Sequence, residues 1–319
     1  MTSPDIDAAR EQLGLDIAEK SGGSEGESAW TIELAATPVK PRGVLRRLLR
    51  SRSAVVGLVV LVGWIVVAMA WPLIVLQDPQ TQDLINGLKG PSAGHWFGTD
   101  NFGRDVFSRV LAGSRTVVLV ALVAACLGVA LGTTIGLVAG YYRGWLEEIL
   151  MRIVDAVMAF PLIVVALIVL AVLGPSKLNV VLVVAVTFAP YNARIIRAAV
   201  LAERQRDFVS AARLRGESGP YIMFVEILPN LFGLIVVELT IRLALAVFTV
   251  ATLSFLGLGI QPPTPDWGLM INENRIALTI QPWPVLLPVL AIALVTIGMN
   301  LISDGLARAN AGVDRGVEG

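Results

Sequence analysis

The sequence predicts an all-α membrane protein with about six membrane-spanning helices. Of its 319 residues, 55% are apolar and only 16% are charged, whereas a soluble domain averages roughly 45–50% apolar and about 25% charged residues. The apolar residues gather in runs close to the ~20 residues that cross a bilayer. We expect these runs to be helical, because a helix satisfies its own backbone hydrogen bonds in lipid.

Six apolar runs define the expected spans. The fourth run is interrupted in its second half, between Pro190 and Arg197, by a proline and three polar residues. A span tolerates such residues where neighbouring helices satisfy the freed backbone groups. The runs cover residues 54–76, 116–140, 151–173, 178–200, 232–256 and 284–304.

Polar segments divide the chain around these spans. Residues 1–41 are polar, rich in Gly, Ser and Glu, and net acidic, and such a segment cannot bury enough apolar surface to order itself. We therefore expect four parts: a disordered cytosolic tail at 1–41, the first transmembrane helix with an extracytoplasmic loop at 42–112, a core of five helices at 113–306, and a cytosolic tail at 307–319.

The orientation follows from the Lys and Arg residues of the connections and tails, which are more frequent on the cytoplasmic side. From Lys40 onward, sixteen of them fall on one side of the predicted spans and six on the other. Both termini are therefore expected in the cytosol, and the long connections 77–115 and 257–283 and a short link at 174–177 outside. The six are Lys89, Arg104, Arg109, Arg115, Lys177 and Arg275.

Several function classes are disfavoured by what the chain contains. Its formal net charge is zero, which gives no electrostatic case for nucleic acid. Cys126 and His95 are the only cysteine and the only histidine, so we expect no metal site, no catalytic residues and no enzyme activity in this chain. Cys126 lies in an apolar run, and we expect it to be a small buried hydrophobe.

The polar connection at 201–231 is predicted to be a short helix, a turn and a second short helix beneath the membrane. Gly216 permits a sharp turn, and Pro220 suits the first turn of a helix. On residue chemistry alone, an ordinary amphipathic connection between spans remains an equal alternative to a functional segment.

A second cluster, His95 to Arg109, precedes the second span. Glycines stand at the expected turns, and Asp100 is a possible N-cap. Without further information the cluster is a capped helix start. Its distinctive residues are Gly98, Thr99, Asp100, Gly103, Arg104 and Asp105.

Glu238 and Arg242 place two charges in the fifth span, four residues apart, where they can pair along one helical face. Intramembrane charges often line a solute path. A structural pair is the alternative, and Glu238 lies only about two turns from Pro229 at ~1.5 Å per residue, which is shallow for a midplane site.

These segments resemble the permease subunits of ATP-binding-cassette importers, specifically the second or "C" permease of the dipeptide and oligopeptide family. The connection at 201–231 is similar to that family's EAA loop, with Ser210 in place of the acidic residue and Glu226 in place of an Ile. The string from Gly98 to Arg109 resembles its first outer loop, and Leu253 to Gly268 its fifth-span exit. Positions of the loop carried over as ATPase-coupling residues are Ser210, Ala211, Ala212, Gly216, Leu228 and Pro229.

The resemblance implies a type I importer permease fold in a bacterial or archaeal inner membrane. It also implies partners: a second homologous permease, two cytosolic ATPase subunits or domains, an extracytoplasmic solute-binding protein and the surrounding lipids. ATP and Mg²⁺ would be bound by the ATPases, since this chain has no GxxxxGK[ST] loop. Peptides or peptide-like solutes are the implied cargo, although Val250 stands where many relatives carry an acidic residue. An ion-coupled secondary transporter is the alternative.

The predicted orientation can be tested with cysteines at Ser28 and Ser92 in a Cys126→Ala background. We expect an impermeant thiol reagent added to intact cells to label Ser92→Cys and not Ser28→Cys, because only the former is placed outside. Labelling after permeabilisation is the control for reactivity. Labelling of Ser28→Cys in intact cells would show that the orientation is wrong.

Overall fold

The computed structural model describes residues 51–311, with side chains to Arg308. Within this range the chain is helical and contains no β-strand, in agreement with the predicted fold class. The expected tail at 1–41 lies outside the described residues, and the C-terminal helix continues to Ala311. The longer helices are α4 (Arg52–Ile74), α5 (Val106–Tyr142), α6 (Gly144–Met158), α7 (Leu162–Leu173), α8 (Lys177–Glu203), α9 (Asp207–Leu214), α11 (Phe232–Phe255), α12 (Trp267–Asn274) and α13 (Trp283–Ala311).

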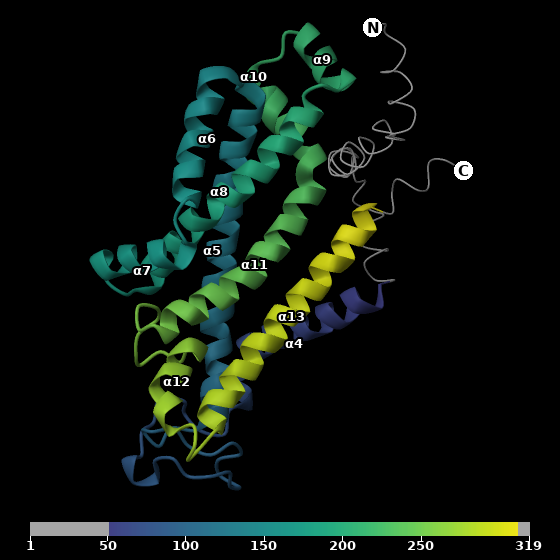
Figure 1. Ribbon diagram of the computed structural model, residues 1–319. Coiled ribbons are helices and arrows are strands. Elements are labelled where there is room, and N and C mark those ends of the chain that lie inside the picture. The colour runs from purple at the N-terminus through teal and green to yellow at the C-terminus, as the bar shows by residue number, and fades with distance from the viewer. Residues whose placement is uncertain (1–50, 312–319) are drawn as a thin grey trace, which may run out of the picture. The chain divides into compact units, whose positions relative to one another are not determined.

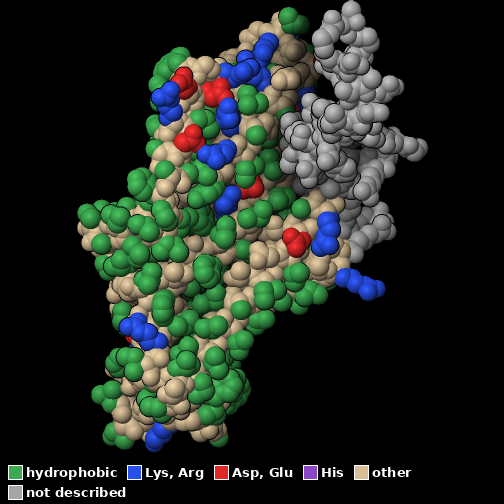
Figure 2. Space-filling model, viewed as in Figure 1, with side chains coloured by type: hydrophobic (Ala, Val, Ile, Leu, Met, Phe, Trp, Pro, Cys, Tyr) green, Lys and Arg blue, Asp and Glu red, His purple; other side chains and the backbone are tan. Residues whose placement is uncertain are grey.

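The helices separate two ends of the bundle (Figure 1). The segment before α5 and the short helix α12 lie together at one end, which we call the outer end after the predicted orientation. Helix α9 and the one-turn helix α10 (Gly219–Tyr221) lie at the opposite, inner end. Charged side chains gather over the inner end, whereas the middle is covered by hydrophobic ones (Figure 2).

Five helical stretches are long and apolar enough to cross a membrane, and a bent pair gives a possible sixth. Four of them match predicted runs directly: α4, α5, α8 and α13. The fifth runs from Gly219 to Phe255 and includes α11. With the bent pair counted as one span, the structure confirms the expected number of about six.

The run at 151–173 does not form the single straight helix that its length suggests. Helices α6 and α7 meet at an angle of 86°, and the break falls at Ala159–Pro161. Pro161 lacks an amide hydrogen and disfavours helical geometry at the residue before it. A proline at the junction therefore accounts for a bend that the hydropathy of the run does not reveal.

The most extensive helix contact in the described bundle is that of α5 with α8. Glycines recur at every fourth position of α5, at Gly128, Gly132, Gly136 and Gly140, so they share one face. A Cβ on Gly132 would overlap the carbonyl oxygen of Ala189, and one on Gly140 would lie 2.8 Å from Cβ of Val200. Small residues let two backbones approach closely in this way within a membrane.

The same contact explains how α8 continues through its polar half. The side-chain amide of Asn192 donates to the carbonyl of Val129 at 2.8 Å and to the hydroxyl of Thr133 at 3.0 Å, both on α5. Arg194 and Arg197 reach from α8 to Asp155 and Glu147 on α6. Neighbouring helices thus supply partners for these side-chain donors, and α8 is unbroken from Lys177 to Glu203.

Cys126 is exposed, so the prediction that it is buried is wrong. It lies two residues before Gly128, and this spacing turns it about 200° away from the glycine face of α5. There it lines an open apolar groove of about 330 Å³ with residues that include Thr133, Phe224 and Leu239.

The glycine contact gives a direct stability prediction. Gly132→Ala should lower the free energy of unfolding by about 1–3 kcal/mol, because the added Cβ forces two backbones apart. The matched control is Gly63→Ala on α4, where an added Cβ meets nothing within 4 Å and alanine is the better helix former. The thermal midpoint of the detergent-solubilised protein measures both. Equal midpoints for the two variants would contradict the packing argument.

Candidate functional site

The predicted site residues fall in three separate places. Six lie at the inner end in α9 and the segment that follows it, six lie at the outer end before α5, and the pair Glu238–Arg242 lies within α11. The structure does not bring these groups together into one site. Each is therefore described by itself.

Helix α9 ends in a turn that requires glycine. Gly216 has a φ of +80°, in the left-handed region where a Cβ is penalised. Its amide donates to the carbonyl of Arg213 at 3.0 Å, and the amide of Glu217 donates to the carbonyl of Ala212 at 3.2 Å. This pair of bonds is the Schellman arrangement that closes many helices. The predicted sharp turn at Gly216 is confirmed.

Helix α9 has one buried and one exposed face. Val209 and Ala212 are fully buried against the inner ends of α5 and α8. Ser210, Ala211 and Leu214 face outward, and Leu214 is 90% exposed. The buried face thus attaches this eight-residue helix to the bundle, and the opposite face presents a small, largely apolar surface away from it.

The chain between α9 and α11 changes helical type twice. Ile222–Ile227 forms a π turn and Leu228–Leu231 a 3₁₀ turn. Pro229 stands in the 3₁₀ turn, and the side chain of Asn230 donates to the carbonyl of Glu226 at 2.7 Å. Back-to-back π and 3₁₀ turns often mark functional hinges, and these two join α9 to the membrane-crossing α11.

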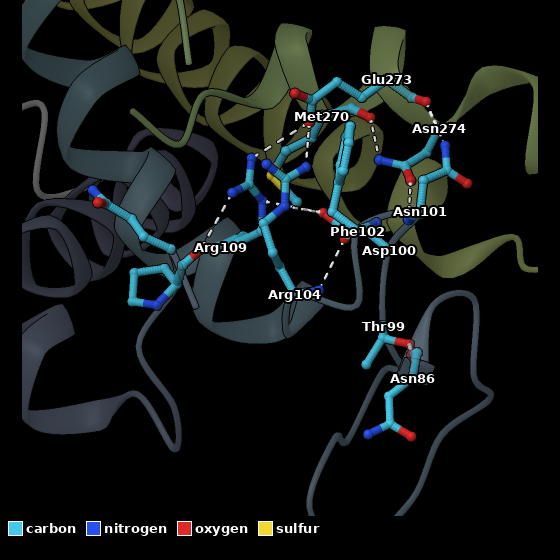
Figure 3. Close-up of polar contacts among 12 residues, drawn as sticks. Asn86, Thr99, Asp100, Asn101, Phe102, Arg104, Arg109, Met270, Glu273 and Asn274 are labelled. Carbon is cyan, nitrogen blue, oxygen red and sulfur yellow. Dashed lines mark hydrogen bonds and ion pairs between the residues drawn. The ribbon is translucent and has the colours of Figure 1, made fainter. Parts of the chain in front are cut away.

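At the outer end, the segment before α5 is tied to α12 by a buried ion network (Figure 3). Arg104 donates through Nε to Oδ2 of Asp100 at 2.6 Å and through Nη2 to Oε2 of Glu273 at 2.5 Å. Arg109 approaches the same two carboxylates at 3.5 Å. Two arginines thus share two carboxylates, and all four side chains are largely withdrawn from solvent.

The other residues of the outer motif shape the loop that holds this network. Thr99 bridges two stretches of backbone, since its hydroxyl donates to the carbonyl of Asn86 and accepts from the amide of Lys89. Asp105 caps α5 by accepting from the amide of Ser108 at 2.8 Å. Gly98 and Gly103 both have positive φ angles and lie close to neighbouring backbone. Asp105, not Asp100, is therefore the N-cap of α5.

Sequence analysis did not identify Glu273 as a site residue. It lies 169 residues from Arg104 in the chain, and no short motif links the two. The motif offers two acidic residues to Arg104 and Arg109, but in the structure Asp105 caps α5 and pairs with His95, which leaves Asp100 alone beside the two arginines. A second buried carboxylate had to come from elsewhere, because an unpaired buried charge is costly.

Asp266 begins α12 and is fully buried at the outer end. Its Oδ1 accepts from the amide of Leu269 at 2.9 Å. Burial raises the pKa of this carboxyl from 3.8 to about 6, against the opposing effect of hydrogen bonds that include the Leu269 amide. Because the folded-state pKa is raised, this group disfavours the fold at neutral pH, and its cost falls as the pH drops through about 6 towards 3.8.

Glu238 and Arg242 form the predicted pair in α11. Nη2 of Arg242 donates to Oε2 of Glu238 at 3.0 Å, and both residues are buried. The guanidinium also lies 5.5 Å from the ring centroid of Tyr191 on α8, within the range of a cation–π contact. The pairing is confirmed, and Tyr191 is a partner that the sequence did not indicate.

Two family descriptions match the chain. Residues 132–311 match "Binding-protein-dependent transport system inner membrane component", and residues 42–91 match "N-terminal TM domain of oligopeptide transport permease C". The chain is 39% identical over 274 residues to the dipeptide transport system permease protein DppC of Alkalihalophilus pseudofirmus, covering 86% of this chain and 90% of that protein.

A second relative is the glutathione transport system permease protein GsiD of Escherichia coli O6:K15:H31. It is 42% identical over 265 residues, which cover 83% of this chain and 88% of that protein. These matches support a permease subunit and give no support to the alternative of an ion-coupled secondary transporter. The chain belongs to the family of binding-protein-dependent transport system inner membrane components, and it is a permease subunit of an ATP-binding-cassette transporter rather than an enzyme.

Proposed function

We propose that this permease subunit forms part of an import path for peptides or peptide-like solutes. The observation that carries the proposal is similarity over more than four fifths of the chain to permeases named for dipeptide and for glutathione transport. Glutathione and dipeptides share an amide bond and charged ends. The proposed cargo is therefore a small zwitterionic solute of this kind.

The other components of the transporter would be separate proteins or subunits. A second, homologous permease would complete the path, and a solute-binding protein would deliver cargo at the outer end. Two ATPase subunits or domains would bind ATP and Mg²⁺, because this chain lacks a phosphate-binding loop of its own. The outer and inner ends correspond to the extracytoplasmic and cytoplasmic sides, in accordance with the charge bias.

We assign coupling with the ATPase to α9 and the residues after it. Ser210, Ala211 and Leu214 form an outward surface that a groove on another protein can receive. Ala212 and Gly216 position this surface, one by packing against the bundle and the other by turning the chain. Leu228 and Pro229 lie in the hinge-like turns that connect the surface to α11, so a displacement of α9 would be transmitted to a membrane-crossing helix.

Glu238 and Arg242 are proposed to be a structural pair. Each already has a partner inside the chain, and Tyr191 covers the guanidinium from α8. A residue that binds cargo needs a free hydrogen-bonding group. Nε of Arg242 is buried without a partner in the described part of the chain, which keeps a role in the solute path as the second possibility.

The coupling assignment predicts a position-specific defect at Gly216. Gly216→Val should abolish most uptake of a radiolabelled dipeptide in proteoliposomes that contain the whole transporter, because a β-branched residue is strained at positive φ. Gly216→Asn is the matched control, since asparagine tolerates this geometry. We expect it to retain most uptake. Both variants should insert normally into the membrane.

Measurements of uptake and of ATP hydrolysis test the coupling assignment and the cargo class separately. If Gly216→Val transports as well as wild type, the coupling assignment is wrong. If wild-type transporter takes up no peptide but the two variants still differ in stimulated ATP hydrolysis, the coupling assignment holds and the cargo class is wrong.

A double-mutant cycle separates the roles of Glu238 and Arg242. Glu238→Gln or Arg242→Gln alone leaves one buried charge without its partner, which costs about 3–5 kcal/mol, so assembly of the transporter should fall. The double variant should assemble better than either single one. Normal uptake by the assembled double variant supports the structural pair. Assembly with lost uptake would instead assign the pair to the solute path.

A further inference from the structure

Two arginines lie against one tyrosine at the inner end of the bundle, and a third follows that tyrosine in the chain. Tyr141 lies in the last turn of α5, and the guanidinium carbons of Arg204 and Arg213 lie 6.0 and 5.6 Å from its ring centroid. Arg143 follows two residues after Tyr141 and acts electrostatically on Arg204. The three come from the ends of α5, α8 and α9, so three separate elements contribute to the cluster.

These arginines lack the acidic partners that their neighbours have. Elsewhere at the inner end Arg194 pairs with Asp155 at 2.5 Å, Arg197 with Glu147, and Arg206 with Glu203 at 3.2 Å. Within residues 51–311, no carboxylate forms an ion pair with Arg143, Arg204 or Arg213, because the ion pairs in this range all involve other basic residues. Arg204 and Arg213 are thus held near each other without an ion pair to a described carboxylate, although the Glu147 carboxylate acts on Arg204 at longer range.

The proximity of the guanidinium groups is electrostatically unfavourable. Partial burial lowers the pKa of Arg204, and the neighbouring guanidiniums of Arg213 and Arg143 lower it further. Like charges at short range repel one another unless an anion lies between them. Arginine is suited to hold such an anion, because its planar fork donates two parallel hydrogen bonds to a phosphate or carboxylate.

We propose that Arg143, Arg204 and Arg213 form a binding site for the phosphate of an acidic phospholipid headgroup. The site would place the headgroup against the ring edge of Tyr141, at the inner boundary of the bilayer. Basic pockets between membrane-crossing helices on the cytoplasmic side bind anionic headgroups in this way. The proposal rests on the predicted orientation, and it does not require that the cargo is a peptide.

The position of the cluster favours a lipid over a carboxylate of the ATPase. Arg204 directly follows the membrane-crossing α8, and the side chain of Arg213 extends from α9 to Tyr141 at the end of α5. The surface assigned to the ATPase is formed by Ser210, Ala211 and Leu214, whereas the guanidinium of Arg213, although this residue is also exposed, lies against Tyr141 of α5. Exposed aromatic side chains also flank Arg143, as Tyr142 is 48% and Trp145 73% exposed. Tyrosine and tryptophan are typical of the headgroup level of a membrane.

A bound headgroup would connect α9 to the ends of α5 and α8. Arg213 is on the segment assigned to ATPase coupling, whereas Arg143 and Arg204 end two membrane-crossing helices. An anion shared by all three would hold α9 against the ends of α5 and α8. We therefore expect acidic lipid to strengthen the attachment of α9 to the bundle, and so to raise the efficiency with which ATP hydrolysis drives uptake.

The test measures lipid binding directly on the assembled transporter. Phosphatidylglycerol and phosphatidylcholine are titrated onto the delipidated complex, and bound lipid is counted by native mass spectrometry. The wild type should prefer phosphatidylglycerol, with a preference that falls as salt rises. Each of Arg143→Gln, Arg204→Gln and Arg213→Gln should weaken phosphatidylglycerol binding about fivefold. Arg152→Gln is the control, because Arg152 is exposed on α6 and already pairs with Glu148.

Several results would overturn the proposal. The first is a wild-type complex with no preference for phosphatidylglycerol, a measurement that needs no variant and does not depend on variant folding. The second is an equal loss of binding in Arg152→Gln. The third is displacement of the lipid by equimolar inorganic phosphate, which would identify a free-anion site.

Carboxylates of the ATPase are the alternative ligands of the same arginines, and the experiment distinguishes them from lipid. If the three substitutions leave lipid binding unchanged but release the ATPase subunits from the complex, the arginines pair with carboxylates of the ATPase and the lipid site is refuted. Peptide uptake is recorded separately. A transporter that fails to take up peptides but still binds phosphatidylglycerol through these arginines contradicts the proposed cargo and leaves the lipid site intact.

Discussion

The close approach of α5 and α8 is the contact on which the other features depend. Four glycines on one face of α5 let the two backbones touch, so any side chain at Gly132 would overlap the backbone of Ala189. Because lipid offers no hydrophobic driving force between helices, such packing and interhelical hydrogen bonds must hold the bundle together. The contact also supplies the partners of Asn192, which allows a polar, proline-containing helix to cross the membrane. The inner ends of α5 and α8 are thereby fixed side by side, and α9 packs on them.

Helix α5 links the two functional ends of the protein. It has 37 residues, which corresponds to about 55 Å at ~1.5 Å per residue, more than the thickness of the hydrocarbon core. Its outer end is capped by Asp105 and tied to α12 by the arginine–carboxylate network. Its inner end carries Tyr141 and the arginines around it. The ends are therefore coupled by a single rigid element, whereas the path from α9 to α11 runs through π and 3₁₀ turns that can deform.

The polar groups of the bundle fall into two energetic classes. The outer network and the pair Glu238–Arg242 are compensated within the chain, so removing one member leaves a buried charge and destabilises the protein. The arginine cluster at Tyr141 forms no ion pair with a described carboxylate, and we propose that a bound anion relieves its repulsion. All of these groups contain arginine, but the outer network and the pair Glu238–Arg242 stabilise the fold, whereas the cluster at Tyr141 is the candidate ligand site.

The sequence by itself determined the fold class, the number of spans at about six, the turn at Gly216 and the pairing of Glu238 with Arg242. Each of these is encoded locally, because lipid demands a minimum apolar length and because pairs four residues apart share a helical face. Only the tertiary structure decided the 86° bend between α6 and α7, the exposure of Cys126, and the roles of Glu273 and Tyr191. These depend on which helix faces which, and Glu273 lies 169 residues from the arginine that it binds. No local pattern specifies such a contact, since it forms only when separate helices pack into one bundle.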